Sequence, residues 1–314
     1  MTTSNTPGGG KAHDGADATT SFRETATAQD AGHVISITAR GVPYSRCRRY
    51  SRSCDNGLGQ LGRGGDPHVL LPIGLSDDDD DDDDGTTTTT TGGAVGGDRG
   101  GGAATAVAAS AAHAYAGGFA DSGHSAILDS LGHLWLCGCD RWQQLGLGSS
   151  RAGSSGYTWK GGKLWQDRFR RDVHVVELLR RLDPTLAAMD DGRSSSTTEG
   201  GTPSRRWIRD VALGGDHTVV LSSNMRDVVA FGKGSEGQLG LSSKPFVSSP
   251  AKSKILSSGT ADIGAVCAYR NCSIALDVNG GVMSKAGKCS LELRGMKKAL
   301  DLCRKRAQET GLVK

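Results

Sequence analysis

Short runs of apolar residues, separated by small or polar ones, occur in pairs along the chain. Residues 125–128 and 133–137 form one pair, and residues 218–221 and 227–231 form another. Each pair is joined by a short segment that contains Gly or Asn. Runs of this length predict strands, and two runs joined by a turn predict a hairpin rather than a helix. The sequence therefore predicts an all-β chain.

The paired runs belong to a longer repeat. The four copies begin at His33, His124, His217 and Cys272. Three copies have a glycine eight residues after the first position, and the copy at His217 has one extra residue in that turn. A single four-stranded blade cannot bury both of its faces, so we expect repeated blades to pack side by side around an axis. The leucines of three Gln-Leu-Gly motifs, Leu61, Leu145 and Leu239, are expected to fill the gaps between blades.

The repeat has a recognisable motif. The best copy reads Gly-Gly-Asp-His-Thr-Val-Val-Leu over 214–221, then Phe231-Gly232, then Gly-Gln-Leu-Gly over 237–240. The copy at His124 follows it closely but has Cys137 at the aromatic position. These motifs resemble the repeat of the regulator of chromosome condensation (RCC1-like) family. The resemblance implies a β-propeller of RCC1-like blades.

About four blades can be recognised, which is too few to close the ring that the resemblance implies. An open ring leaves sheet edges exposed, and proteins usually avoid such edges. Three explanations stay open: further blades have diverged, the ring closes by self-association or with a partner, or the chain is incomplete. The predicted fold is therefore a partial or diverged propeller.

Low-complexity stretches divide the predicted blades. The first thirty residues and the tract around Asp77–Asp84 contain few large apolar side chains, so we expect disorder there. The predicted order is a disordered tail (1–30), a degraded first blade (31–75), a low-complexity Asp/Thr/Gly linker (76–105), a blade (106–190) with a basic-aromatic insertion (149–171), a linker (191–206), a blade (207–257), a degraded blade (258–290) and a basic amphipathic helix (291–314).

The formal net charge of +3 hides a segregation of charge, because eight aspartates lie together at 77–84. A basic folded part with an acidic tether could bind acidic proteins or nucleic acid, or the tract could screen the chain's own basic surface. The eight cysteines include no Cys-x-x-Cys pair, so we predict no metal site. Without a signal peptide or a long apolar run, we expect an intracellular protein, cytoplasmic or nuclear, with reduced thiols and no membrane association.

The repeat decides how several polar residues are interpreted. His124 and His217 recur at one repeat position, which favours a structural hydrogen bond within or between blades over catalysis. The resemblance implies that the loop before His217 lies near a surface that engages a small GTPase, with Asp216 contributing there. The segment Gly232–Gly237 matches a dinucleotide-binding pattern, but Pro245 follows in place of a helix. We predict no cofactor and no small-molecule substrate.

The predicted insertion at 149–171 interleaves aromatic and basic side chains, which suits either a protein partner or nucleic acid. Its partner-binding candidates are Tyr157, Trp159, Lys160, Lys163, Trp165, Arg168, Arg170 and Arg171. Alternatively, the insertion packs on the propeller rim, where Trp159 and Trp165 add core area. The helix predicted over 291–314 could dock on the last blade, bind a partner or carry a nuclear address.

These patterns favour a non-enzymatic protein-interaction scaffold. The first alternative, suggested by the resemblance, is a guanine-nucleotide exchange factor for a Ran-like small GTPase. The second alternative is a chromatin or nucleic-acid binding module. Neither a Ser-His-Asp order, a carboxylate pair at useful spacing nor a P-loop stands out in the sequence, so we predict no chemical catalysis. A protein partner is expected ahead of nucleic acid.

Overall fold

The computed structural model describes residues 21–48, 59–75, 110–146, 157–183, 207–241 and 245–314, with gaps at 29, 64, 120–121, 161–162, 173 and 293. For residues 157–168 only the backbone is described. Within these ranges the chain forms four antiparallel sheets and two helices, which confirms the prediction of an all-β fold built from blade-type units.

Each sheet is a meander in which strands that follow one another in the chain pair side by side. The first sheet has the order β1 (Phe22–Thr27), β2 (His33–Thr38), β3 (Pro43–Cys47), β4 (Leu71–Pro72). The second has the order β5 (Ala111–Gly117), β6 (His124–Asp129), β7 (Leu134–Cys139), β9 (Lys163–Asp172), β8 (Tyr157–Lys160). The third has the order β10 (Ile208–Leu213), β11 (His217–Ser222), β12 (Val228–Lys233), β13 (Phe246–Lys252). The fourth has three strands, β14 (Ile263–Tyr269), β15 (Cys272–Asp277) and β16 (Val282–Gly287).

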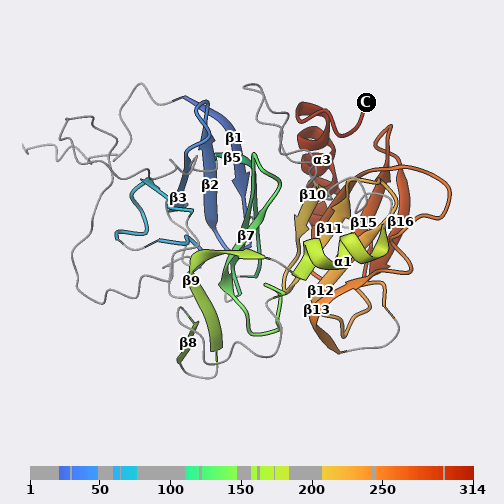
Figure 1. Cartoon of the computed structure of the whole chain (residues 1–314), viewed down its shortest axis with the longest axis horizontal. Coiled ribbons are helices and arrows are strands. Elements are labelled where there is room, and N and C mark those ends of the chain that lie inside the picture. Colours follow the sequence, from blue (N-terminus) through green and yellow to red (C-terminus); the bar gives the residue numbers. More distant parts are fainter. Residues whose placement is uncertain are drawn as a thin grey trace, which may run out of the picture.

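Consecutive sheets pack face against face, and Figure 1 shows them following one another across the molecule. Leu145, from the loop after β7, lies in one hydrophobic cluster with Val220 and Phe231 of the third sheet. Leu239, from the loop after β12, lies in another with Val266 of the fourth sheet. Both leucines are almost fully buried, as expected for residues that fill the space between blades. These two Gln-Leu-Gly motifs thus carry a side chain into the next interface, whereas Leu61 of the first motif packs with Cys47 of its own sheet.

Helix α3 (Arg294–Glu309) covers the free face of the fourth sheet, on the side away from the third sheet. Met296 and Leu300 pack there against Ile274 and Leu276 of β15. The helix therefore occupies the side on which a further blade would pack, and it lies beside the fourth sheet in Figure 1. The prediction of a helix in the last segment is confirmed, and docking on the last blade is the outcome observed.

Three parts of the predicted organisation are wrong. Residues 22–27, placed in a disordered tail, form β1, whose mixed Thr and Glu residues leave it largely exposed. Residues 163–171, placed in an insertion, form most of β9, which pairs with β7 as a strand of the second sheet. Helix α1 (His174–Leu182) was not predicted; Asp172 accepts the N–H of Val175 at its start, and Leu179 is buried against the third sheet. The other low-complexity segments lie outside the described residues, and the remaining boundaries stay predictions.

The glycine of the Gln-Leu-Gly motif is required by close approach. Gly146 has a φ of +68°, and a Cβ there would lie 2.8 Å from the Phe231 ring. At Gly62 the corresponding Cβ would meet Phe169 of β9 at 2.3 Å. Phe169 is buried in the interface of the first two sheets, beside Cys137. It therefore fills the space left by the missing aromatic residue at position 137.

Replacing Gly146 with Ala should destabilise the fold strongly. The substitution combines a left-handed backbone with a clash against Phe231, for which we expect a loss of about 2–4 kcal/mol in the free energy of unfolding. Urea denaturation followed by circular dichroism measures the change. Gly259→Ala is the matched control, because no atom lies within 4 Å of a Cβ there. Equal stability of the two variants would contradict this packing.

Candidate partner-binding cleft

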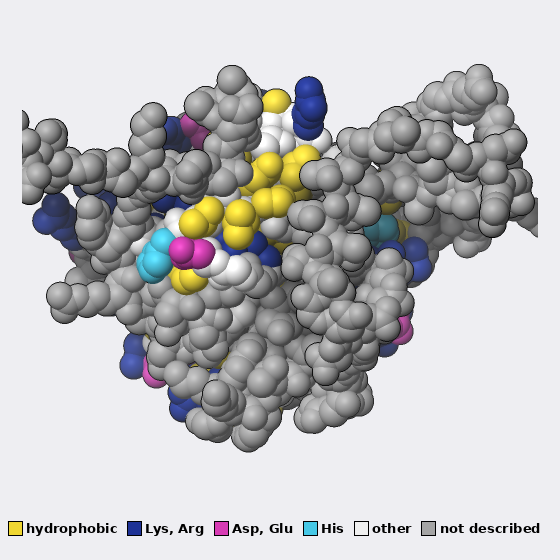
Figure 2. All heavy atoms as spheres, turned by 90° about the vertical axis from the view of Figure 1, so that its left-hand side faces the viewer, with side chains coloured by type: hydrophobic (Ala, Val, Ile, Leu, Met, Phe, Trp, Pro, Cys, Tyr) yellow, Lys and Arg dark blue, Asp and Glu magenta, His cyan; other side chains and the backbone are white. Residues whose placement is uncertain are grey.

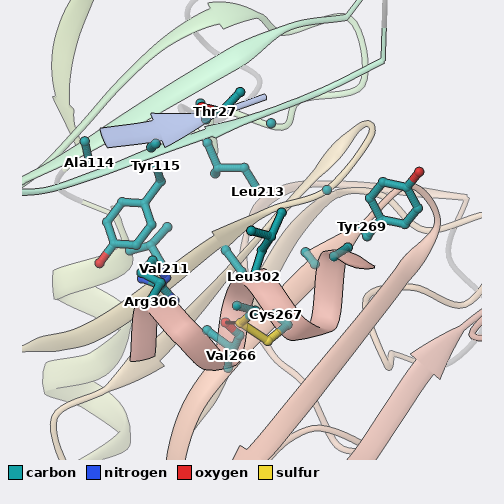
Figure 3. Close-up of a pocket in the computed structure, with 18 of the residues that line it drawn as sticks. Thr27, Ala114, Tyr115, Val211, Leu213, Val266, Cys267, Tyr269, Leu302 and Arg306 are labelled. Atoms are coloured by element: carbon teal, nitrogen blue, oxygen red, sulfur yellow. Dashed lines mark hydrogen bonds between the residues drawn. A yellow bond between two sulfur atoms is a disulfide. The ribbon is translucent and has the colours of Figure 1, made fainter. Parts of the chain in front are cut away.

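The first strand of every sheet, together with α3, surrounds a cleft of about 440 Å³. We call β1, β5, β10 and β14 the inner strands, because they line it. Much of the wall consists of small side chains such as Ala116, Ala212 and Ala268. Figure 3 shows Leu302 of α3 beside Leu213 of β10. The cleft is thus formed by backbone-rich walls with one large apolar side chain on the helix.

Arg306 anchors α3 to the inner strands. Its guanidinium donates to both carboxylate oxygens of Asp210, at 2.7 and 2.9 Å, and lies 5.1 Å from the centroid of the Tyr115 ring. Burial, and after it the charge of Asp210, raise the pKa of the Tyr115 phenol, which therefore stays neutral. A buried bidentate pair fixes orientation, because leaving either charge alone in this environment is costly. Arg306 and Asp210 therefore set the position of the helical wall.

An Arg and the acidic residue that follows it in the chain, here called an Arg–acid pair, join neighbouring inner strands at two places. These contacts were not predicted from the sequence. Arg23 of β1 donates to the carbonyl oxygens of Ala111 and Ala112 in β5, the latter at 3.1 Å. Glu24 accepts the N–H of Ala114 at 3.0 Å. The pair therefore supplies one donor and one acceptor to the backbone of the next sheet.

The same device joins the third sheet to the fourth. Arg209 donates to the carbonyl oxygen of Gly264 at 3.3 Å, and Asp210 accepts the N–H of Val266 at 3.0 Å. The signal in the sequence was an Arg followed by an acidic residue at one repeat position in two copies. It escaped notice because its partners are backbone atoms, which carry no sequence signature.

Buried histidines also connect the sheets, which confirms the predicted structural hydrogen bond for His217. For His124 the prediction is not borne out, because neither ring nitrogen has a hydrogen-bond partner among the described residues. His33 Nε2 lies 2.8 Å from Ser125 Oγ of the next sheet, and His217 Nε2 lies 2.7 Å from Ser273 Oγ. Ser125 donates its single hydroxyl hydrogen to the carbonyl oxygen of Gln60, at 2.7 Å. His33 must therefore donate through Nε2, which assigns the neutral tautomer with its proton on that atom.

Burial keeps these imidazoles uncharged. It lowers the pKa of His33 and of His217 to about 3, with the nearby His124 as the second cause in both. It also lowers the pKa of His124 to about 4. All three rings are fully buried between sheets. The shifted groups are therefore parts of the interfaces and do not face the cleft.

Asp216 lies on the loop before His217 and is only 4% exposed. Its carboxylate lies 3.4 Å from Lys233 Nζ, which in turn lies 4.9 Å from the centroid of the Trp142 ring. The next interface has an ion pair at the equivalent place, between Glu236 and Lys288 at 2.6 Å. The structure thus places Asp216 within a contact between sheets, and its contact with a partner stays a prediction.

The basic and aromatic candidates lie on β8 and β9, which are not among the inner strands that line the cleft. For six of them the structure describes the backbone but not the side chain: Tyr157, Trp159, Lys160, Lys163, Trp165 and Arg168. Arg170 and Arg171 are half-buried on β9. Two interpretations depend on side chains that the structure does not describe. One is that Trp159 and Trp165 pack on the propeller rim, and the other is that this segment binds a protein or nucleic acid. Both stay predictions.

The prediction of reduced thiols is wrong for the fourth sheet. A disulfide joins Cys267 of β14 to Cys303 of α3, and a second joins Cys272 to Cys289. Spacing alone could not reveal these pairings. Disulfides persist in oxidising compartments, so the premise of the intracellular prediction does not hold for these four cysteines.

Within the described ranges, no three His, Cys, Asp or Glu side chains are grouped as metal ligands would be. None of the described helices is long and apolar enough to cross a membrane.

No family model matches the chain, and no curated protein is similar to it. Solved structures with a similar arrangement include that of Kap60 bound to yeast RCC1 (Prp20), with 14% identity over 84% of this chain and 43% of that chain, and a TM-score of 0.48. Another is human WBSCR16, with 15% identity over 81% of this chain and 44% of that chain, and a TM-score of 0.46. The chain thus spans less than half the length of the solved chains that it matches.

The buried histidines predict a pH dependence of stability. Because the pKa of His217 is lowered on folding, the unfolded chain binds the proton first as the pH falls below about 6.5, and stability is lost from there downwards. His217→Gln should remove about 2 kcal/mol of the loss between about pH 7 and pH 5. Urea denaturation at both pH values measures it, with the exposed His68→Gln as control. An unchanged pH dependence in the His217 variant would refute this assignment.

Proposed function

We propose that this protein is a non-enzymatic protein-interaction scaffold whose cleft receives a segment of a partner protein. The observation that carries this proposal is the cleft itself, which the four inner strands and α3 enclose from several sides. Concave sites with largely apolar walls and a few polar groups are typical of binding sites. A rigid frame of packed sheets holds this one open.

The chemistry of the frame supports binding rather than catalysis. A general acid or base needs a titratable group that faces the substrate with a suitable pKa. The histidines with shifted pKa values lie between sheets, and Arg306 at the cleft wall is engaged by Asp210. Asp30 and Arg270, at the opposite end of the cleft, pair with each other at 3.0 Å. The charged groups of the walls therefore serve mainly to hold the elements together.

Leu302 is the strongest candidate for an anchor contact. It lines the cleft from α3 and is 47% exposed, although it is a large apolar side chain. Leu213 of β10 lies beside it, and several alanines of the inner strands leave room for an apolar side chain of a partner. Buried apolar contacts at the centre of an interface supply most of its binding energy.

Replacing Leu302 with Asp should weaken partner binding by about tenfold or more, because a charge would replace an apolar contact at the interface centre. The full chain, immobilised, is used to capture binding proteins, which are identified and quantified by mass spectrometry. Phe246→Asp is the matched control, since Phe246 is 50% exposed on β13 and does not line the cleft. Loss of the same proteins from both variants, or from neither, would reject the cleft as the binding site.

Exchange of guanine nucleotide on a Ran-like GTPase is the second candidate. It is supported by the resemblance of the repeat at His217 and by the position of Asp216 on the loop that leaves the inner strand β10. A partner would have to reach a carboxylate that now pairs with Lys233.

Release of labelled GDP from a Ran-like GTPase tests this candidate directly. Asp216→Asn should lower an observed acceleration by about tenfold, because a charged hydrogen-bond partner is lost. Asp301→Asn, on the exposed side of α3, should leave the rate unchanged. No acceleration by the wild-type protein, or full activity of the Asp216 variant, would exclude the candidate.

A further inference from the structure

The outer face of the first sheet differs from the corresponding face of every other sheet. We define this outer face by the residues that point away from the second sheet: Thr25 and Thr27 of β1, Val34 and Ser36 of β2, and Tyr44 and Arg46 of β3. The cross-strand register places them on one side, with Thr25 opposite Ser36, Ser36 opposite Tyr44, and Val34 opposite Arg46. Ile35 and Ile37 point the other way, into the interface with the second sheet.

Described residues leave this outer face without a covering sheet. Val34 and Tyr44 belong to none of the hydrophobic clusters that the described residues form, whereas Ile35 and Ile37 belong to one. Thr25 and Thr27 are exposed and Tyr44 and Arg46 are half-buried, whereas Val34 and Ser36 of the central strand β2 are buried. In the view from this side of the molecule, Figure 2 shows hydrophobic side chains near its centre, with basic and acidic ones beside them. Among the six residues that define the outer face, Arg46 is the one charged residue.

Two substitutions within the repeat explain its polarity. Where the third sheet has buried Val220, the first has Ser36, and where the third has buried Phe231, the first has Arg46. Arg46 is half-buried and forms no hydrogen bond or ion pair with any described residue. A half-buried guanidinium without a partner favours binding of a carboxylate.

The backbone of β1 offers a second carboxylate site. The bond from Ala28 N–H to His33 O fixes the alternation of β1, so the Thr25 N–H points away from β2. The equivalent N–H groups, of Ala114 in β5 and Val266 in β14, each bind a carboxylate from the preceding sheet. No described residue supplies one to Thr25. By analogy with these two interfaces, a carboxylate is the group that fits the Thr25 N–H.

We propose that the outer face of the first sheet binds an extended, acidic segment of a partner protein. One carboxylate of that segment accepts the Thr25 N–H, and another pairs with Arg46. The two positions lie two strands apart, at about 10 Å, which an extended segment of a few residues spans. The exposed ring of Phe22, edge-to-face with Tyr44 at 5.8 Å, offers an apolar contact beside them.

A second copy of this chain fits the face less well. Both of its Arg–acid pairs are engaged: Glu24 holds the N–H of Ala114, and Asp210 holds Val266 and Arg306. The free face of its last sheet is covered by α3. A second copy therefore has no free Arg–acid pair of this kind to offer the outer face.

The test uses the full chain and a fluorescent peptide of alternating Glu and Val, EVEVEVEV, which favours an extended conformation. Fluorescence anisotropy should show saturable binding that weakens with salt, and no binding of QVQVQVQV or KVKVKVKV. Arg46→Gln should weaken binding of the acidic peptide by about tenfold, since a charge-assisted contact is lost. Arg40→Gln is the matched control, because Arg40 is exposed in the turn after β2 and outside the outer face.

A second variant tests the backbone site without removing a charge. Thr25→Pro deletes the N–H that points away from β2, and a strand edge tolerates proline. It should also weaken peptide binding by about tenfold, with an unchanged circular dichroism spectrum. Should it fail to fold, the Arg46 and Arg40 pair still decides the question.

The outcomes separate this proposal from the cleft. Thr25 and Thr27 also line the cleft, so the Arg46 and Arg40 pair is the comparison that separates the two sites. Leu302→Asp should leave peptide binding unchanged, because Leu302 lines the cleft from α3 and Arg46 does not line it. Equal binding of the acidic and neutral peptides, or equal affinity of the Arg46 and Arg40 variants, overturns the proposal and leaves the cleft untouched. Peptide binding that requires removal of residues 1–20 would show that the chain itself occupies the face, and would also overturn it.

Discussion

Every sheet of this protein has two faces that must be covered, and the rest of the structure follows from how each is covered. Between sheets the cover is mutual: Leu145 and Leu239 enter the next interface, and buried histidines and Arg–acid pairs satisfy the polar groups there. At the two ends of the row the described residues provide no neighbouring sheet. A capping element or a polar surface must then replace it, as in other repeat proteins.

The two ends of the row solve this problem differently. The last sheet keeps an apolar face and buries it under α3. On its edge strand β16, Lys285 takes the place that Ala230 has in β12, and charges at such positions discourage further pairing. The first sheet instead replaces core residues by Ser36 and Arg46. The cleft lies between these two ends, bounded by β1 on one side and α3 on the other.

The sequence allowed the interior to be predicted better than the ends. The repeat spacing gave four sheets and the role of His217, because each sheet interior repeats the same packing problem. Strand β1 was missed because an exposed strand lacks the apolar alternation of a buried one. Strand β9 was missed because the second copy of the repeat has Cys137 at its aromatic position. Phe169 of β9 fills that space instead, from a position where the repeat motif has no aromatic residue. Contacts to backbone atoms and the pairing of cysteines leave no pattern in the composition of a single chain.

The disulfides add a property that packing alone would not give. Cys272 and Cys289 both lie between Cys267 and Cys303 in the chain, so one covalent loop is nested inside the other. A protease that cuts once between residues 290 and 302 would sever the backbone but would not release α3. The helix would stay tethered through Cys303, and the last sheet would keep its cover. The end of the row that α3 covers would therefore keep its cover after a single cleavage in this segment.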